Sequence, residues 1–317
     1  AVYILDLATG EVLAEKKFTG SSSDCPNADD ADPEKNMCFA FVASPAVLDL
    51  NFDGFADVVY LVDMGGQVFK WVINGLGEDR VNDASGLRTQ PNWPFRRWFA
   101  APTESFGGAT YYKNLFFPPA ATLIGNKLWL AFGSGERLHI GYLGDGTDDD
   151  PDDDDENNRF WVITDPDPFE QANLGELSET DLTDFSGSEE AASFSNRGYF
   201  FRVPDGEKFV TNVEIFVGDV IAASFTPAAT TDVCTARGDA TLYAFRVRNG
   251  EGQFKDDSDN TTRGLAIGSG LPTDPKISIG VGGTDTRIII EKSGADFESE
   301  EGKDVDVGGR LLYWRER

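Results

Sequence analysis

Positive charge is scarce in this sequence, which has 27 lysine and arginine residues against 55 aspartate and glutamate residues and a formal net charge of −28. Phosphate backbones and anionic lipid surfaces repel such a protein. Long apolar runs are missing too, and no stretch of about 18 apolar residues could cross a bilayer as a helix. We therefore expect a folded acidic protein with no nucleic-acid partner and no membrane insertion.

Histidine is almost absent, since His139 is the only one. A Ser/His/Asp triad would have to use it, yet no Gly-x-Ser-x-Gly turn accompanies it. The usual zinc ligand sets would need more histidines or closely spaced cysteines, and neither is present. We expect His139 to be structural and the protein to be no enzyme.

Cysteine is scarce as well, with three residues in the chain. Cys25 and Cys38 bracket a polar, Asp-rich loop, where a disulfide would stabilise a weakly packed segment by roughly 3 kcal/mol. The bracketing favours a Cys25–Cys38 disulfide and an oxidising compartment, with two unpaired thiols as the alternative. Cys234 is left over in either case.

Amphipathic helical periodicity is nearly missing, while short aromatic and β-branched runs recur and end at glycine turns. This pattern predicts an all-β fold. Five segments look alike: residues 2–6, 59–63, 160–163, 242–245 and 312–314. Such irregular repeats are typical of a β-propeller with four-stranded blades and variable insertions, and a β-sandwich with long loops is the competing interpretation.

Three polar segments mark the expected insertions. Residues 145–156 hold nine acidic residues out of twelve, a run that repels itself and prefers water. Residues 170–196 and 252–263 are similarly polar. We expect all three to be surface loops between blades. Length alone suggests two domains, although large all-β folds routinely exceed the usual domain size as one unit.

The most specific motif lies at residues 49–57. Oxygen-bearing side chains stand at positions 1, 3, 5 and 9, and Gly54 stands at position 6, which matches the first nine positions of a calcium loop. Alternate residues of a tightly curled loop point to its inside, and the glycine permits the turn that closes them around one ion. The predicted Ca²⁺ ligands are Asp49, Asn51, Asp53, Asp57 and, through its backbone carbonyl, Phe55.

One position departs from the helix-flanked form of this loop, because the twelfth residue is Tyr60 instead of a bidentate glutamate. Strand-like sequence flanks the loop at residues 45–48 and 58–61. We therefore expect a shortened site between two strands, with Asp57 as the closing ligand. The alternative is a turn that binds nothing, since Asp, Asn and Gly are also the usual turn formers.

At this point the residues suggest a family, because residues 46–71 resemble a blade of the PilY-type type IV pilus tip proteins. Further segments resemble the same family in the same order: 132–137 (FGSGER), 159–165 (RFWVITD), 198–208 (GYFFRVPDGEK), 224–244 and 310–316. The resemblance extends from the opening segment 3–10 to the C-terminus. It implies a modified β-propeller that forms one C-terminal domain over residues 1–317, with its calcium ligands in the 49–57 loop.

The resemblance also implies a function. PilY-type proteins are secreted, sit at the pilus tip with the minor pilins, and take part in adhesion, pilus biogenesis and twitching motility. We accordingly expect an extracellular protein with three kinds of partner: minor pilins, the N-terminal adhesive domain of the same protein, and a host or abiotic surface. Residues 1–7 lack an initiator methionine and a basic leader and resemble a strand, which indicates a start after processing or in mid-domain.

Two other functions fit parts of the sequence. A fragment of a calcium- and quinone-dependent dehydrogenase would resemble a propeller too, but that class has adjacent cysteines over the cofactor, and the three cysteines here are nowhere adjacent. A calcium-dependent lectin would stack sugar rings on the aromatic segments 93–95 and 98–99, which core packing explains as well. Residues 237–239 spell Arg-Gly-Asp, a cell-attachment tripeptide that also arises by chance.

Overall fold

The computed structural model describes residues 1–21, 32–73, 93–106, 109–125, 127–138, 140, 158–170, 172, 174–194, 196–228, 238–256, 258–278, 287–293 and 297–301. In these ranges the chain is built of strands, and its helical segments are the short 3-10 turns η2 (Pro33–Asn36) and η3 (Glu179–Asp181). The predicted all-β class is confirmed. No helix of the described ranges is long and apolar enough to cross a membrane. Outside them lie Cys25, His139, Cys234, Arg237, the acidic run at 145–156 and the strand predicted at 312–314.

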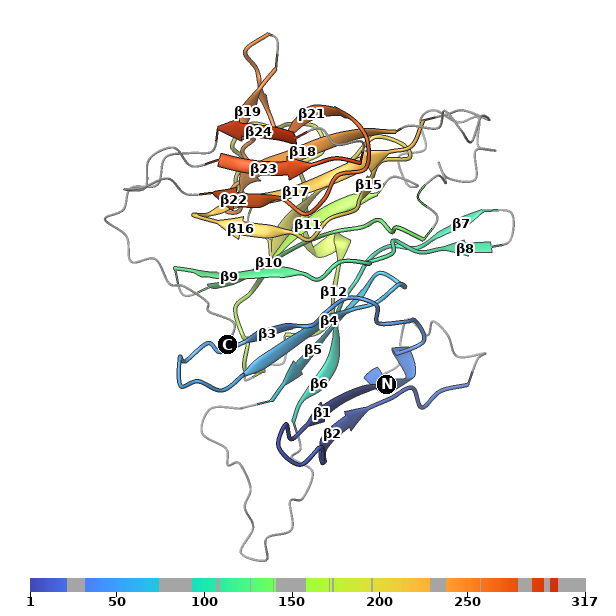
Figure 1. Ribbon diagram of the computed structural model, residues 1–317. Coiled ribbons are helices and arrows are strands. Elements are labelled where there is room, and N and C mark those ends of the chain that lie inside the picture. The colour runs from blue at the N-terminus through green and yellow to red at the C-terminus, as the bar shows by residue number, and fades with distance from the viewer. Residues whose placement is uncertain are drawn as a thin grey trace, which may run out of the picture.

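Three sheets share one pattern, a meander of four antiparallel strands (Figure 1). Sheet I contains β3 (Ala46–Leu48), β4 (Val58–Val62), β5 (Gln67–Val72) and β6 (Phe95–Ala100). Sheet II contains β9 (Ala120–Ile124), β10 (Lys127–Gly133), β11 (Arg159–Asp165) and β14 (Gly198–Arg202). Sheet III contains β16 (Glu214–Phe216), β17 (Asp219–Thr226), β18 (Asp239–Arg246) and β21 (Gly264–Ser269), and β15 (Lys208–Phe209) also pairs with β17. A four-stranded meander is the pattern of a propeller blade.

Smaller sheets accompany these three. The hairpin of β1 (Val2–Leu5) and β2 (Val12–Lys16) precedes sheet I, and sheet IV, made of β22 (Lys276–Ser278), β23 (Arg287–Glu291) and β24 (Phe297–Glu301), follows sheet III. Two further hairpins pair β7 (Glu104–Phe106) with β8 (Ala109–Tyr111) and β19 (Phe254–Lys255) with β20 (Thr261–Thr262). The β19–β20 hairpin lies in the polar segment 252–263 and projects from the molecule, as expected of a surface insertion (Figure 1).

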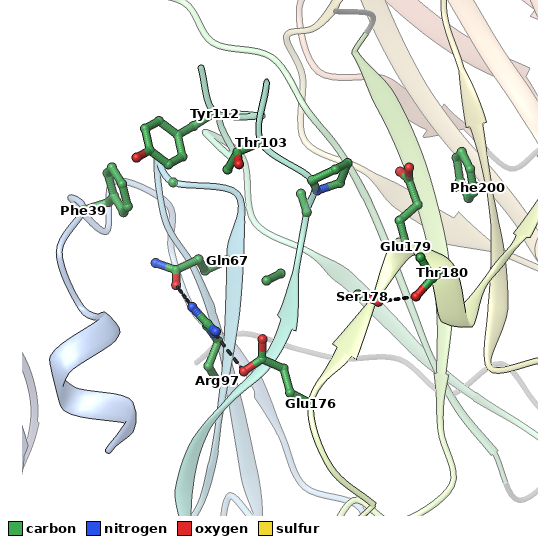
Figure 2. A pocket seen from close by; sticks show the side chains of 14 residues that line it. Phe39, Gln67, Arg97, Thr103, Tyr112, Glu176, Ser178, Glu179, Thr180 and Phe200 are labelled. Carbon is green, nitrogen blue, oxygen red and sulfur yellow. Dashed lines mark hydrogen bonds and ion pairs between the residues drawn. The ribbon is translucent and has the colours of Figure 1, made fainter. Parts of the chain in front are cut away.

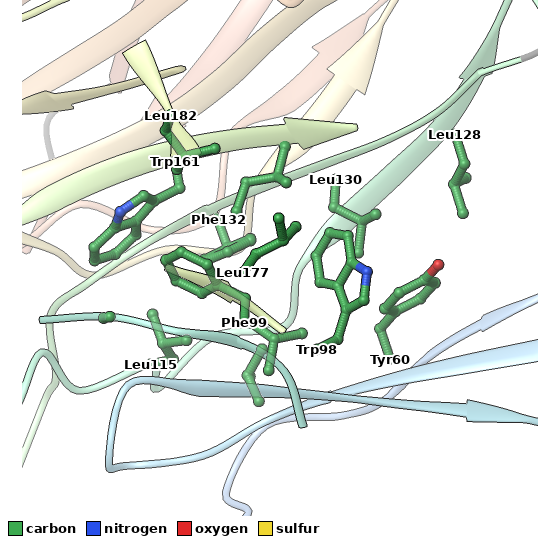
Figure 3. Close-up of a cluster of buried hydrophobic side chains, with 14 of the residues drawn as sticks. Tyr60, Trp98, Phe99, Leu115, Leu128, Leu130, Phe132, Trp161, Leu177 and Leu182 are labelled. Atoms are coloured by element: carbon green, nitrogen blue, oxygen red, sulfur yellow. The ribbon is translucent and has the colours of Figure 1, made fainter. Parts of the chain in front are cut away.

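The sheets stack face to face in chain order, with one apolar cluster in each gap. Figure 3 shows the cluster between sheets I and II, where Trp98 lies beside Tyr60 and Trp161 packs against Phe99 and Phe132. The corresponding clusters are built around Phe160, Phe201 and Phe245 between sheets II and III, around Leu242, Ile288 and Ile290 between sheets III and IV, and around Ala14, Leu61 and Trp71 between the β1–β2 hairpin and sheet I. Sheets I, II and III are therefore covered on both faces.

Burial of both faces of a sheet explains why its strands are continuous apolar runs in the sequence. In β4, Val58, Tyr60 and Val62 face sheet II, while Val59 and Leu61 face the β1–β2 hairpin, and all five are buried. Successive strand residues point to opposite faces, so a strand buried on both sides becomes a continuous apolar run. This is the reason that the sequence shows short apolar runs where a half-exposed sheet would show alternation.

The segment 170–196 differs from the prediction of a surface loop. Its residues 174–185, which we call the strap, contain β12 (Leu177–Ser178), paired in parallel with β6, and β13 (Thr183–Asp184), paired in parallel with β14. Leu177, Leu182 and Phe185 are buried in the inter-sheet clusters. The prediction failed because acidic residues dominate the composition of this segment, whereas several of these acids pair with basic residues of the sheets.

The aromatic segments 93–95 and 98–99 belong to the core. Trp98 and Phe99 are fully buried between sheets I and II, and Trp93 packs edge-on against Trp71 at a centroid distance of 6.5 Å. Trp98 and Phe99 are therefore not available as a sugar-stacking platform, and the half-buried rings of Trp93 and Phe95 pack against the cluster around Trp71.

Candidate functional sites

The 49–57 loop joins β3 to β4, as the sequence predicted. The two strands are antiparallel, and Leu48 pairs with Val58 directly next to the loop. Inside the loop, Phe52 and Gly54 both have positive φ values, of 60° and 90°. The second value is in the range that glycine adopts without strain, so Gly54 allows the tight curl. The rings of Phe52 and Phe55 are exposed.

Hydrogen bonds turn the polar side chains toward the inside of the loop. The amide of Asp53 donates to Asp49 Oδ1 at 3.2 Å and to Asn51 Oδ1 at 2.9 Å, so these two oxygens converge on one hydrogen. The amide of Gly54 donates to Asp49 Oδ2 at 2.9 Å. Asp57 is buried, and its Oδ2 accepts the amide of Leu50 at 2.7 Å. Asp49, Asn51 and Asp57 therefore line one small interior.

The donor set fits a hard cation, because carboxylate and amide oxygens are the ligands that Ca²⁺ takes. Asp53 instead directs Oδ1 to the amide of Phe55 at 2.9 Å. In the described part of the chain, no group of three His, Cys, Asp or Glu side chains is placed so that it could hold a metal ion. The hydrogen bonds of the loop bring together Asp49, Asn51 and Asp57, which are three of the predicted ligands. Calcium binding itself stays a prediction.

A second cluster of charged groups lies buried between sheets I and II. Lys70 of β5 is fully buried, and its Nζ contacts Asp165 Oδ2 at 2.6 Å, Glu170 Oε1 at 2.7 Å and the carbonyl of Asp167 at 2.6 Å. An ammonium group has three N–H donors, so these three acceptors satisfy it. Arg96 adds a second cation, with Nε 2.8 Å from Glu170 Oε1.

Tyr60 completes this cluster from β4. Its hydroxyl donates to Asp165 Oδ2 at 2.6 Å, and burial, reinforced by the Asp165 charge, raises the pKa of Tyr60 well above its usual value. Two cations, two carboxylates and a neutral phenol therefore balance in charge. Because Tyr60, Lys70 and Asp165 are buried, the cluster fixes how sheet I sits on sheet II. These three groups have their partners inside the protein and are not accessible to a substrate. The prediction missed this cluster, although a lysine inside the apolar strand run Val68–Val72 is itself a signal of a buried partner.

A cavity of about 610 Å³ lies beside the strap (Figure 2). Phe39 and Tyr112 form an aromatic pair on one side, with ring centroids 4.6 Å apart. Glu176 and Glu179 of the strap lie across the cavity, and Arg97 of β6 reaches toward Glu176. Local sequence patterns did not predict this cavity, because its walls come from six separate segments of the chain.

Arg97 connects the cavity to a buried carboxyl group. Its Nη1 donates to Gln67 Oε1 at 3.0 Å, and Gln67 Nε2 donates to Asp63 Oδ2 at 2.8 Å. Asp63 also accepts the amide of Gly65 at 2.9 Å. Burial raises the pKa of Asp63 to about 7, against the lowering effect of these hydrogen bonds. Asp63 follows β4, whereas the 49–57 loop precedes it, so the two features lie at opposite ends of one strand.

The raised pKa of Asp63 predicts a loss of stability with rising pH. The folded state keeps the proton up to about pH 7, whereas the unfolded chain releases it near its ordinary value of 3.8. Folded protein therefore binds more protons between these values, and its stability decreases as the pH rises. In urea unfolding at pH 5 and pH 7.5, wild type should lose about 2.5 kcal/mol more than Asp63→Asn. Equal losses of stability in both proteins would contradict a raised pKa of Asp63 in the folded state.

Two of the segments that resemble the PilY-type family, FGSGER and GYFFRVPDGEK, lie where sheets II and III meet. Glu207, in the GYFFRVPDGEK segment, is buried and accepts the hydroxyl of Tyr243 at 2.8 Å. The next residue, Lys208, pairs with Glu136 of the FGSGER segment at 3.4 Å. Arg137 Nε donates to the carbonyl of Val210 at 2.8 Å. These motif residues therefore hold neighbouring sheets together.

Comparisons with known proteins give one informative result. No protein-family model matches the chain, and no curated protein matches it in sequence. Among solved structures, the crystal structure of the Pseudomonas aeruginosa PilY1 C-terminal domain matches with a TM-score of 0.58 and 14% sequence identity. The match covers 95% of this chain and 66% of that chain. The chain thus has the fold of the PilY1 C-terminal domain and spans about two thirds of the length of the matched structure.

Proposed function

We propose, from this likeness of fold, that the chain is the C-terminal domain of a type IV pilus tip protein. The observation that carries the proposal is the match to the PilY1 C-terminal domain over 95% of the chain. The six sequence segments in the family's order support it independently. In this proposal the stacked sheets belong to a modified propeller, the protein lies outside the cell at the pilus tip, and it acts by binding.

The proposed partners are the minor pilins, the N-terminal adhesive domain of the same protein and the surface to which the pilus attaches. The non-enzymatic role agrees with the charged groups described above, since the buried clusters around Lys70 and Glu207 have their partners inside the protein. A dehydrogenase fragment is the alternative, and it would require a quinone cofactor in the purified protein. An absorbance spectrum and a calcium-dependent dye-reduction assay separate the two.

We expect the full-length protein to co-purify with minor pilins. In the bacterium that makes it, the protein carries an affinity tag and is isolated from sheared surface material, and its partners are identified by mass spectrometry. Deleting the gene should remove surface pili, and complementation should restore them. As a control, complementation with a protein in which the exposed residues 258–260 are replaced by two glycines should restore pili equally. Normal piliation in the deletion strain, with no minor pilins in the purified material, would contradict the proposal.

The proposed calcium ion supports the conformation of the domain. Its ligands are Asp49, Asn51, Asp53 and Asp57, with the carbonyl of Phe55. Three carboxylates within one short loop repel each other, and no lysine or arginine of the loop offsets them. A bound divalent ion would replace this repulsion by attraction and hold β3 against β4. Asp53 would turn inward from the amide of Phe55 on binding.

A further inference from the structure

The cavity beside the strap is built to take a neutral ligand, because its charged groups already have partners. Arg97 Nε lies 2.8 Å from Glu176 Oε2, and Arg159 Nε lies 3.1 Å from Glu179 Oε1. Arg97 is also held by Gln67. An anion would have to displace a carboxylate from its arginine, and a cation would have to displace an arginine from its carboxylate. Each exchange would break an existing ion pair to form a new one, so neither a cation nor an anion gains a partner that is free.

The same cavity presents polar groups that are not fully used. Within the described residues, the hydroxyls of Thr103 and Tyr112 have no hydrogen-bond partner, and the hydroxyl of Thr180 contacts that of Ser178 at 2.7 Å. Glu176 meets its arginine through Oε2 and Glu179 through Oε1, so a second oxygen of each carboxylate is not engaged. A hydrocarbon ligand would bury these groups without partners, which costs free energy for each one.

An apolar strip runs along these polar groups. It consists of Ala100, Ala101 and Pro102, followed by the rings of Phe39 and Tyr112. Figure 2 shows the aromatic pair on one side of the cavity and the strap with its glutamates on the other. A ligand that fits both sides needs one apolar face and a rim of groups that both donate and accept hydrogen bonds. The volume of about 610 Å³ is in the range of small-molecule sites.

We propose that this cavity binds a sugar ring of the hexopyranose class. A pyranose is neutral, its hydroxyls donate and accept, and one face of the ring carries only C–H groups, which pack on aromatic and aliphatic side chains. The C–H face lies against the ring of Tyr112 and against Ala101, and the sugar hydroxyls meet Glu176, Glu179, Thr103 and the hydroxyl of Tyr112. This function goes beyond the pilus assignment and does not depend on it, because the test uses the isolated chain.

The test measures binding of three probes, methyl α-D-glucopyranoside, methyl β-D-galactopyranoside and methyl α-D-mannopyranoside, by saturation-transfer NMR and titration. At least one should bind with a Kd of about 1 mM, as expected for a ligand of this size. Thr103→Trp places an indole in the cavity from an exposed position and should abolish binding. The matched control, Thr110→Trp, changes an exposed threonine of β8 that does not line the cavity and should bind as wild type does.

A finer variant is Tyr112→Phe, which keeps the ring contact with Phe39 and removes only the hydroxyl. It should weaken binding about fivefold, the effect of one hydrogen bond. Far-UV circular dichroism and the thermal midpoint verify that each variant is folded. The proposal is overturned if no glycoside binds more tightly than about 30 mM, if Thr103→Trp binds as well as Thr110→Trp does, or if tetramethylammonium binds in preference to every glycoside.

Discussion

Replacing Lys70 by methionine should lower the free energy of unfolding by about 3–5 kcal/mol. Methionine fills much of the same space, so the loss comes from Asp165 and Glu170, which would be left buried with fewer cationic partners. The measurement is urea unfolding at neutral pH. In the double variant Lys70→Met/Asp165→Asn one of the stranded charges is absent, and part of the stability should return.

The control for this experiment is Lys17→Met. Lys17 pairs with Glu15 at 3.3 Å, but 60% of its side chain is exposed, so its loss should cost less than about 1 kcal/mol. The comparison isolates the effect of burial on the stability that an ion pair contributes, because both variants remove a lysine that has a carboxylate neighbour. A Lys70→Met protein as stable as Lys17→Met would show that the buried cluster contributes nothing to the contact between sheets I and II.

Calcium should raise the stability of the wild-type protein and leave Asp53→Ala unchanged. A dissociation constant of about 10 µM, within the range of loops of this type, gives a gain of about 2.7 kcal/mol in 1 mM calcium. Asp53 is chosen because Asp57 holds the amides of Leu50 and Asn51, and its removal would damage the loop itself. Calorimetric titration measures calcium binding, and thermal unfolding with and without calcium measures the gain in stability.

Asp205→Ala is the matched control for the calcium experiment. Asp205 is an exposed aspartate that precedes a glycine with positive φ, as Asp53 does, but it lies in the turn before β15. It should bind calcium as wild type does. Without calcium, Asp53→Ala should be about as stable as wild type, since loss of one hydrogen bond to Phe55 is offset by lower repulsion among the carboxylates. Equal calcium uptake by Asp53→Ala and wild type would show that the loop is only a turn.

Local patterns in the sequence predicted much of this fold. The apolar runs at 2–6, 59–63, 160–163 and 242–245 coincide with β1, β4, β11 and β18, and the turn chemistry of residues 49–57 correctly placed a tight loop between two strands. These features depend on neighbouring residues, whose propensities and spacing the sequence shows directly.

Features that join distant segments could not be predicted in this way. Lys70 and its acceptors are about a hundred positions apart, and so are Tyr60 and Asp165. The strap was misplaced for the same reason, because Glu176 and Glu179 resemble solvent-exposed acids until Arg97 and Arg159 are known to lie beside them. The cavity forms only when the separate segments that line it have folded together. No pattern within one segment could therefore predict it.

The strap has a mechanical consequence. Within a few residues the chain adds a strand to the outer side of β6 in sheet I and then another to the outer side of β14 in sheet II. A load that pulls these sheets apart is therefore carried by covalent bonds of residues 179–182 as well as by the apolar cluster between the sheets. To separate them, the load must strip β12 or β13 from its neighbour. We expect sheets I and II to yield together under tension, as one element.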